Sequence, residues 1–298
     1  MTRWAVLGVV LASTGWGQPY LRTRANDEGL VCVAWVDRTI VFTPDSAGST
    51  RTPGDTEFVA IDQAIGAWVS AGQVCSDLRV LRAVAQPLLI VGRDTRASNA
   101  IVFRETACEA VVPVNHACQA DSSCSNLFQC WDDATDTIAL TTTTYSPRTG
   151  ELVDADIALN AARFLFTTVS SPPCPPNADA PTCVATDVQN TLTHELGHAL
   201  GFAHVDGETS TMAPTADLGD IQKRTVDEGT RRGLCETYPV GLQSPSCEGL
   251  ASTSLRLTGS SVSVCSATSA APAWLSILCS MLMWRRVGAS AHRARRKR

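Results

Sequence analysis

The sequence lacks any apolar run long enough to cross a membrane as a regular helix. The N-terminal run from Trp4 to about Leu11 and the C-terminal run from Ala273 to Trp284 are both shorter than the ~20 residues of a full span. The 298 residues carry a net charge of −5, with 44% hydrophobic and 18% charged residues. This is an ordinary globular composition, and it predicts one sizeable domain with appendages, or two small domains.

Paired C-x-x-C motifs are also absent, so a zinc ion held by cysteines has no support in the sequence. The chain nevertheless has 12 cysteines. Ten of them lie in the segment from Cys32 to Cys247, and this even number predicts five disulfides in an oxidising compartment. We predict a bond between Cys174 and Cys183, which flank a proline-rich segment. A second group is expected to staple one long loop: Cys108, Cys118, Cys124 and Cys130.

The two ends of the chain differ from the rest. Residues 1–17 have a basic start, a short apolar segment and small residues before a possible cleavage site, which is the pattern of a secretory signal peptide. We place the cut after Gly17, with a competing site near Ala12 or Ser13. The expected domain is 18–248, followed by a Ser/Thr/Ala-rich linker at 249–272.

Residues 273–298 combine an apolar segment with a cluster of arginines. This pattern fits a membrane anchor, and it resembles the C-terminal sorting signals of some bacterial surface proteins. A nonfunctional apolar tail is the alternative. The basic cluster lacks interleaved aromatic residues, so we expect no nucleic-acid partner. The sequence thus predicts an exported protein that is secreted or attached to the cell surface.

Only five histidines occur in the chain, and three share one motif: His194-Glu195-Leu196-Gly197-His198-Ala199-Leu200-Gly201-Phe202-Ala203-His204. On a helix, residues four apart share a face, so His194 and His198 can bind one ion. Glu195 lies about 100° further round the helix, where it can accept a proton without filling a ligand position. Gly201 permits a sharp turn that returns His204 as a third ligand. Three protein ligands leave one position for water, the arrangement of a catalytic zinc site.

Met212 follows this motif closely, within Ser210-Thr211-Met212-Ala213-Pro214. Motif and methionine together resemble the metzincin family of zinc endopeptidases, in which a methionine-containing turn passes beneath the metal. The resemblance implies an α+β fold with a twisted mixed sheet, an antiparallel edge strand, a long active-site helix and a Met-turn. It also implies that Ala213, Pro214 and Thr215 line the pocket just past the scissile bond.

The order of predicted elements extends the resemblance over about 31–238 and, among subfamilies, favours the matrixins. Apolar and β-branched runs predict strands at 31–42, 88–91, 100–103, 138–145 and 152–159, and helical spacing predicts a helix at 57–71. Residues 104–136 are expected to be a cysteine-rich loop region. Asp187 is expected to cap the active-site helix, and a closing helix is expected within 226–239. By resemblance, residues 138–144 form the edge strand to which an extended peptide substrate could pair.

Several departures from the matrixin pattern limit what it implies. Leu152 stands where a histidine of a second, structural zinc is expected, so we expect one catalytic zinc only and treat His116 as a loop residue. Asp154 and Asp156 offer carboxylates for a calcium ion, but Ile157 replaces a third acid; solvent-exposed acids are the alternative. Only about a dozen residues separate the predicted cleavage site from the first predicted strand, so we expect no inhibitory pro-domain between them. We expect Cys32 to be a disulfide partner rather than a latency switch.

These residues predict a zinc metalloendopeptidase. The three histidines would hold the metal, and Glu195 would act as general base toward a water and then as proton donor to the leaving amine. Asp206 and Glu208 are expected to be exposed rather than catalytic. The alternative is a secreted adhesion or protein-binding module on the same fold with little turnover, which the presence of Glu195 disfavours.

Overall fold

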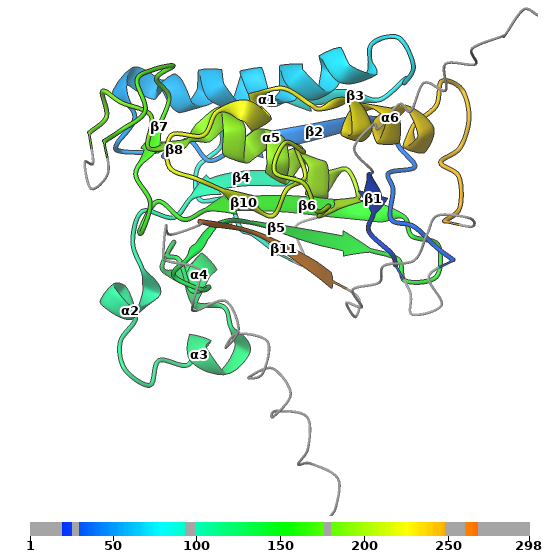
Figure 1. The fold of residues 1–298 in the computed structure, drawn as a ribbon. Helices are drawn as coiled ribbons and strands as arrows, with labels where there is room; N and C mark the ends of the chain where they lie inside the picture. The colour runs from blue at the N-terminus through cyan, green and yellow to red at the C-terminus, as the bar shows by residue number, and fades with distance from the viewer. Residues whose placement is uncertain (1–19, 26–29, 93–98, 176–179, 248–259, 268–298) are drawn as a thin grey trace, which may run out of the picture. The chain divides into compact units, whose positions relative to one another are not determined.

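A mixed sheet forms the centre of the computed structural model, which describes residues 20–25, 30–92, 99–175, 180–247 and 260–267 (Figure 1). The sheet has seven strands in the order β10-β11-β5-β6-β4-β2-β3. Their bounds are β2 (Thr39–Pro44), β3 (Arg79–Arg82), β4 (Asn99–Phe103), β5 (Thr137–Tyr145), β6 (Leu152–Leu159), β10 (Thr215–Ala216) and β11 (Ser260–Ala267). Strands β2, β3, β4 and β6 are parallel, whereas β5 runs antiparallel to β6. The predicted α+β fold with a mixed sheet is confirmed. The prediction that residues 138–144 form an edge strand is wrong, because β11 pairs with the side of β5 that faces away from β6.

Two long helices pack together on one side of this sheet: α1 (Thr56–Gly72) and α5 (Val188–Ala199). Helix α1 confirms the helix predicted at 57–71, and it buries Ile61, Ile65 and Trp68 because they recur at helical spacing. The Trp68 indole donates a hydrogen bond to the Thr193 carbonyl at 2.8 Å. Its ring also stacks on Phe202, with centroids 5.7 Å apart. These contacts fix the position of α5 against α1.

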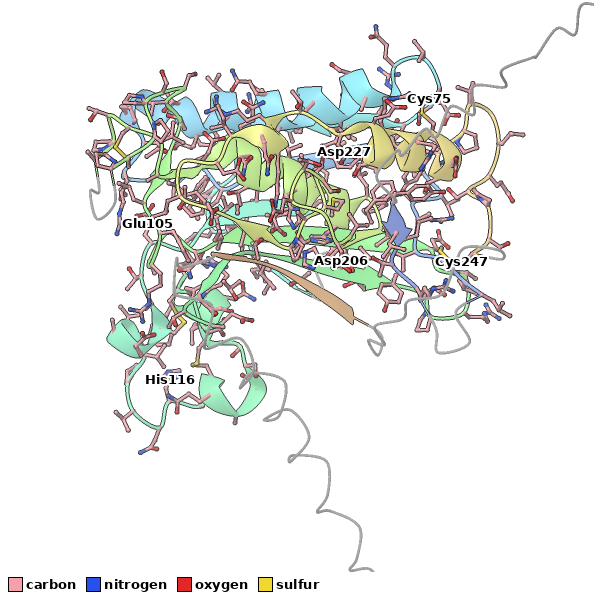
Figure 2. The ribbon with its side chains drawn as sticks, in the orientation of Figure 1. Cys75, Glu105, His116, Asp206, Asp227 and Cys247 are labelled. Atoms are coloured by element: carbon pink, nitrogen blue, oxygen red, sulfur yellow. A yellow bond between two sulfur atoms is a disulfide. The ribbon has the colours of Figure 1, made fainter. Side chains whose placement is uncertain are left out.

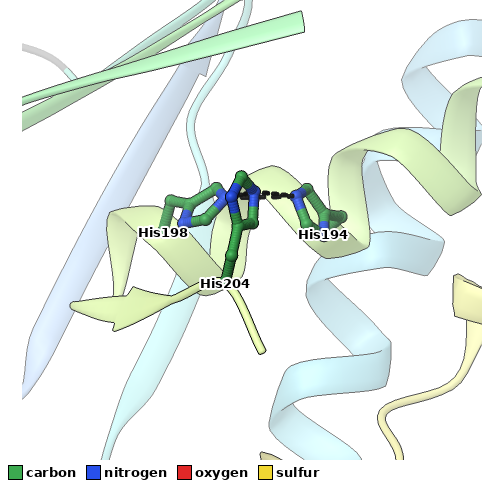
Figure 3. Close-up of side chains that lie close together, drawn as sticks. All are labelled: His194, His198 and His204. Atoms are coloured by element: carbon green, nitrogen blue, oxygen red, sulfur yellow. Dashed lines mark hydrogen bonds between the residues drawn. The ribbon is translucent and has the colours of Figure 1, made fainter. Parts of the chain in front are cut away.

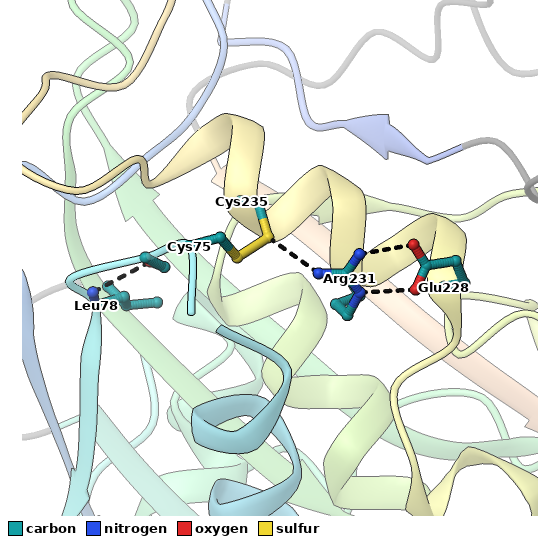
Figure 4. The surroundings of a disulfide bond; sticks show 6 residues. Cys75, Leu78, Glu228, Arg231 and Cys235 are labelled. Carbon is teal, nitrogen blue, oxygen red and sulfur yellow. Dashed lines mark hydrogen bonds and ion pairs between the residues drawn. A yellow bond between two sulfur atoms is a disulfide. The ribbon is translucent and has the colours of Figure 1, made fainter. Parts of the chain in front are cut away.

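The closing helix α6 (Glu228–Thr237) lies within the predicted range 226–239 and is tied to the end of α1 by the Cys75–Cys235 disulfide (Figure 4). An Arg231–Glu228 ion pair lies beside that bond on the surface of α6. Just past the helix, the buried Tyr238 donates its hydroxyl to the Leu200 carbonyl at 2.8 Å. The end of α6 therefore braces the end of α5.

The cysteines between Cys32 and Cys247 all form disulfides, five in number as predicted. Cys174 bonds Cys183, which confirms the predicted pair. Cys32 bonds Cys247 and so is a structural cysteine. Within the region predicted as a loop lie three short helices, α2 (Cys108–Val111), α3 (Cys118–Asp121) and α4 (Cys124–Leu127), held by the Cys108–Cys130 and Cys118–Cys124 bonds.

Two of the predicted strands are wrong or misplaced. Residues 88–91 form no strand: Leu88 has a positive φ and is 74% exposed. The next amides are satisfied by side chains instead, since Leu89 N–H donates to Asp45 and Val91 N–H to Asn126. In the range 31–42, only the last residues belong to β2; residues 32 and 34 make isolated bridges. The apolar content of these runs reflects packing and not continuous pairing.

Shorter elements complete the described part. Strand β1 (Leu21–Arg22) pairs with β9 (Phe202–Ala203), and β7 (Phe166–Thr167) pairs with β8 (Thr186–Asp187). Two short 3-10 helices are η1 (Pro53–Asp55) and η2 (Gln222–Arg224).

Part of the chain that the sequence suggested to be linker, 249–272, contains strand β11 at 260–267. The predicted signal peptide at 1–17 and the tail at 273–298 lie outside the described residues. In the part of the chain that is described, no helix has both the length and the apolar character of a membrane span.

Candidate metal centre

Helix α5 begins and ends where the sequence predicted. The Asp187 carboxylate accepts the Asn190 N–H at 2.7 Å, which caps the first turn, and it also pairs with Arg224. The apolar residues recur at helical spacing, which predicts one buried face, and they are at most 1% exposed: Val188, Leu192, Leu196, Ala199 and Leu200. The chain then turns at Gly201, where φ is +88° and a Cβ atom would lie 2.5 Å from the Val33 carbonyl oxygen. Any side chain at 201 would therefore be strained and would clash with backbone.

The helix and the turn bring the three predicted metal ligands together (Figure 3). The Nε2 atom of His194 lies 3.1 Å from that of His198 and 3.2 Å from that of His204. The remaining Nε2–Nε2 distance, between His198 and His204, is 3.0 Å. Nitrogen ligands of a tetrahedral zinc ion, bound at 2.0–2.1 Å, lie about 3.3 Å apart. The three nitrogens thus have the spacing of a zinc coordination shell.

Hydrogen bonds at the far side of two rings fix which nitrogen faces the centre. His194 Nδ1 lies 2.7 Å from the Thr211 carbonyl oxygen, and His198 Nδ1 lies 2.8 Å from that of Phe202. A carbonyl only accepts, so both Nδ1 atoms carry the proton, and both Nε2 atoms present lone pairs. Lone pairs this close repel one another unless a cation lies between them. The donor set therefore fits a metal ion.

Electrostatics keep these histidines neutral. Burial, helped by the positive charge of Lys223, lowers the pKa of His194 well below its ordinary value. Burial also lowers the pKa of His198 strongly, and that of His204 to about 4. Neutral imidazole is the form that binds a metal, so the site can take up an ion without first releasing protons.

Glu195 is fully buried beside this cluster. Its Oε2 atom accepts a hydrogen bond of 2.5 Å from the Thr141 hydroxyl of β5, whereas no described residue bonds the buried Oε1. Burial raises the pKa of Glu195 to about 8, a rise that the Thr141 hydrogen bond and the Lys223 charge oppose. One carboxylate oxygen is thus fixed by the protein and the other is free to meet a water or a substrate group.

The Met-turn lies directly beneath α5. Met212 is 1% exposed and packs against Gly197, where a Cβ atom would clash with the methionine side chain. The preceding Thr211, whose carbonyl orients His194, donates its own N–H to the Asp227 carboxylate at 2.8 Å. Asp227 also caps α6 through Gly229 and Thr230. The Asp227 carboxylate therefore connects the closing helix to the residue whose carbonyl orients His194, a predicted metal ligand.

Hydrogen bonds explain the charge of Asp227. Burial raises its pKa, but the hydrogen bonds from Thr230 and Thr211 outweigh burial and hold the pKa below its ordinary value. Asp227 is thus an anion that accepts from the turn beneath the histidines and from the start of α6.

The residues predicted to line the pocket wall follow the Met-turn. Ala213 is buried, Pro214 is half-buried, and Thr215 is exposed in β10. Lys223 supports them from inside the protein: it is 1% exposed, and its Nζ donates to the carbonyls of Ala213 at 2.6 Å and Thr215 at 2.9 Å. A buried ammonium group thus fixes the backbone of this wall.

The other predicted polar residues are not members of the histidine cluster. Asp206 and Glu208 are exposed, as predicted, and His116 lies in the loop between α2 and α3, where it contacts Phe128 (Figure 2). Asp154 and Asp156 are not exposed acids: they are 4% and 0% exposed. Asp156 accepts the N–H groups of Gly92 and Ala100 at 2.7 Å each, so it joins a loop to two strands.

Sequence reasoning missed several supporting residues: Thr141, Gly197, Lys223 and Asp227. Gly197 carried a signal, because glycine inside a helix costs about 1 kcal/mol and needs a packing reason. The others are distant in sequence from the motif, and no local pattern marks them.

This fold and this arrangement of side chains define a metzincin-like domain. Comparison with protein families agrees: residues 131–239 match the model of the family described as Matrixin (Peptidase_M10). The matched segment includes β5, β6, α5, the Met-turn and α6. No curated protein matches the chain. The match indicates a metallopeptidase-type domain and implies zinc as its metal.

Proposed function

We propose that the chain is an exported zinc-dependent endopeptidase. The observation that carries the proposal is the convergence of three neutral imidazole nitrogens, 3.0–3.2 Å apart, beside a buried carboxylate. His194, His198 and His204 would hold the zinc ion. When bound, zinc brings the pKa of its water to about 7 and polarises the scissile carbonyl.

Glu195 would move the protons of the reaction. With Oε2 held by Thr141, Oε1 is available to accept a proton from the attacking water and later to donate it to the leaving amine. The hydrogen bond from Thr141 stabilises the anionic carboxylate, so it favours the state that can act as a base. Burial removes competing water from the carboxylate.

The wall and the adjacent strand would hold the substrate. Backbone groups of β5 would hold an extended peptide only where β11 does not already pair with them, and residues 213–215 would line the pocket just past the scissile bond. Because Lys223 ties down the carbonyls of Ala213 and Thr215, the wall is preorganised and loses little entropy on binding. A buried catalytic carboxylate serves no evident purpose in a module that only binds, which argues against the adhesion alternative.

The decisive experiment compares the purified, oxidised, zinc-loaded chain with its Glu195→Ala variant on casein over several hours. We expect cleavage by the parent, its abolition by a chelator, and its restoration by added zinc. The variant should bind zinc with unchanged stoichiometry and lose at least ~100-fold in rate. Equal cleavage by both chains would refute the role of Glu195.

Export is tested separately, by expressing the chain with its own N-terminus in a secreting host and sequencing the released protein. We expect the released protein to begin at Gln18. Retention of Met1 in the mature protein would refute the proposed signal peptide.

A further inference from the structure

Strand β11 lies between the two elements that the proposed function assigns to substrate. It pairs antiparallel with β5 along Ser260–Ser266 and parallel with β10 at Thr215 and Ala216 (Figure 1). Strand β5 is the strand expected to pair with a peptide, and Thr215 belongs to the expected pocket wall. A segment of the chain itself therefore occupies the space between them.

The register places this segment in front of the catalytic carboxylate. Ser263 lies opposite Thr141, and Thr141 is the residue whose hydroxyl donates to Glu195. Strand β11 also lies in contact with α5, the helix that carries Glu195 and two of the metal ligands. The backbone near Ser263 thus crosses the site at the level of Glu195.

Occupation by β11 excludes a second strand. The side of β5 that faces away from β6 can pair with one extended chain at a time, because each N–H and C=O on that side forms one ladder bond. A peptide that binds β5 as a strand needs the groups that Ser260–Ser266 already uses. The two modes of pairing are mutually exclusive.

We propose that residues 260–267 act as an internal occupant of the substrate groove and lower the activity of the chain toward other proteins until they are displaced or cut. The effect on activity rests on the proposed function, whereas the occupation of the groove by 260–267 rests only on the pairing of β11 with β5 and β10.

The size of the effect follows from tethering. The strand is joined by residues 248–259 to Cys247, which the Cys32–Cys247 disulfide fixes to the domain. A short tether gives an effective concentration in the millimolar range. If the free segment bound with a Kd of about 0.1 mM, the tethered one would reduce the free groove roughly tenfold.

The first test weakens the pairing in the full chain. Ser263→Pro/Val264→Pro removes two adjacent N–H donors, one of which faces β5, because consecutive residues of a strand alternate between neighbours. The matched control, Ala251→Pro/Ser252→Pro, places the same prolines outside β11. We expect the first variant to cleave casein at least ~10-fold faster than the parent and the control to match the parent. Equal rates for all three chains would overturn the proposal.

A second readout does not need activity. In the Glu195→Ala background, a labelled peptide with the sequence of 260–267 (serine replacing the cysteine) is titrated into each chain. We expect about tenfold tighter binding to the Ser263→Pro/Val264→Pro chain than to the control. If no chain cleaves casein, the proposed function fails while this titration still decides occupancy, and equal affinities would overturn it.

The register is tested by crosslinking, which also covers the case in which the proline variant does not fold. Thr142 lies opposite Val262, so Thr142→Cys/Val262→Cys should form a disulfide, detected by peptide mapping without reduction. The matched control Thr142→Cys/Ser263→Cys moves one cysteine to the other face and should not crosslink. Crosslinking of the control alone, or of neither pair, would overturn the register. Cleavage of the parent chain between Val262 and Cys265, with no such cleavage in the Glu195→Ala chain, would support the proposed position of β11 in the groove.

Discussion

Replacement of Gly197 by alanine tests whether the Met-turn supports the metal ligands from below. Glycine inside α5 costs about 1 kcal/mol relative to alanine, so on propensity alone Gly197→Ala should stabilise the protein. The structure predicts the opposite. A Cβ atom at 197 would clash with Met212 Sδ, and it would lie 3.0 Å from both Met212 Cε and Trp68 Cζ2.

Trp68 has little freedom to move away, since its indole is bonded to the Thr193 carbonyl and its ring stacks on Phe202. Met212 must therefore shift. Overpacking of this kind costs about 1–3 kcal/mol, which cancels or outweighs the gain in propensity and leaves a net loss of up to about 2 kcal/mol. Movement of Met212 also disturbs Thr211, whose carbonyl holds His194. We expect zinc affinity to fall about tenfold.

The assay is a double-mutant cycle with Met212→Ala, measured by urea unfolding of the zinc-free chains and by competitive zinc titration. Without the methionine side chain the added methyl group finds space, so Gly197→Ala should become neutral or stabilising in the Met212→Ala background. We expect a coupling free energy of at least about 1 kcal/mol. A Gly197→Ala chain that is more stable than the parent and binds zinc as tightly would refute this account of the Met-turn.

Three further predictions concern the proton carrier, the helix cap and the ion. Thr141→Val removes the donor that stabilises the Glu195 anion, so the pKa of Glu195 should rise. On acidification, casein cleavage by this variant should therefore be lost at a higher pH than cleavage by the parent. Thr141→Ser should keep the pH profile of the parent. Asp187→Ala removes the cap of α5 and the carboxylate that pairs with Arg224, so the free energy of unfolding measured in urea should fall by about 2–4 kcal/mol. Asp187→Asn keeps an acceptor for the cap but loses the charge. An equal loss in Asp187→Asn would contradict the contribution of the cap acceptor, and no loss would contradict that of the ion pair. Chelation should lower the melting temperature, since an ion present at 1,000 times its Kd stabilises the folded state by about 4 kcal/mol; His198→Ala should abolish that dependence.

The motif was predictable because its geometry is local. Residues four apart on a helix share a face whatever surrounds them, so His194 and His198 had to converge once α5 formed. The turn at Gly201 is equally local, and with it the return of His204. The same reasoning explains why the helix over 57–71 was predicted correctly.

Local patterns failed where the surroundings decide. Residues 88–91 are apolar enough for a strand, but Asp45 and Asn126, from elsewhere in the chain, accept the amides of Leu89 and Val91. Similarly, a run of serine and valine at 260–267 reads as linker in isolation and becomes a strand because β5 offers it an edge. Hydrogen-bond partners distant in sequence determine both outcomes.

The sequence by itself determined the three clustered histidines, the glutamate beside them, the helix that carries Glu195 and two of these histidines, the number of disulfides and the Cys174–Cys183 pair. The helix, its histidines and its glutamate follow from residue type and short spacing, which fix geometry through backbone angles, whereas the number of disulfides follows from the even count of cysteines. Only the tertiary structure decided that Thr141 holds Glu195, that Lys223 fixes the pocket wall, that Asp227 supports the Met-turn, and that β11 lies against β5. Each of these contacts joins segments far apart in the chain, and packing of the whole domain is what brings them within bonding distance.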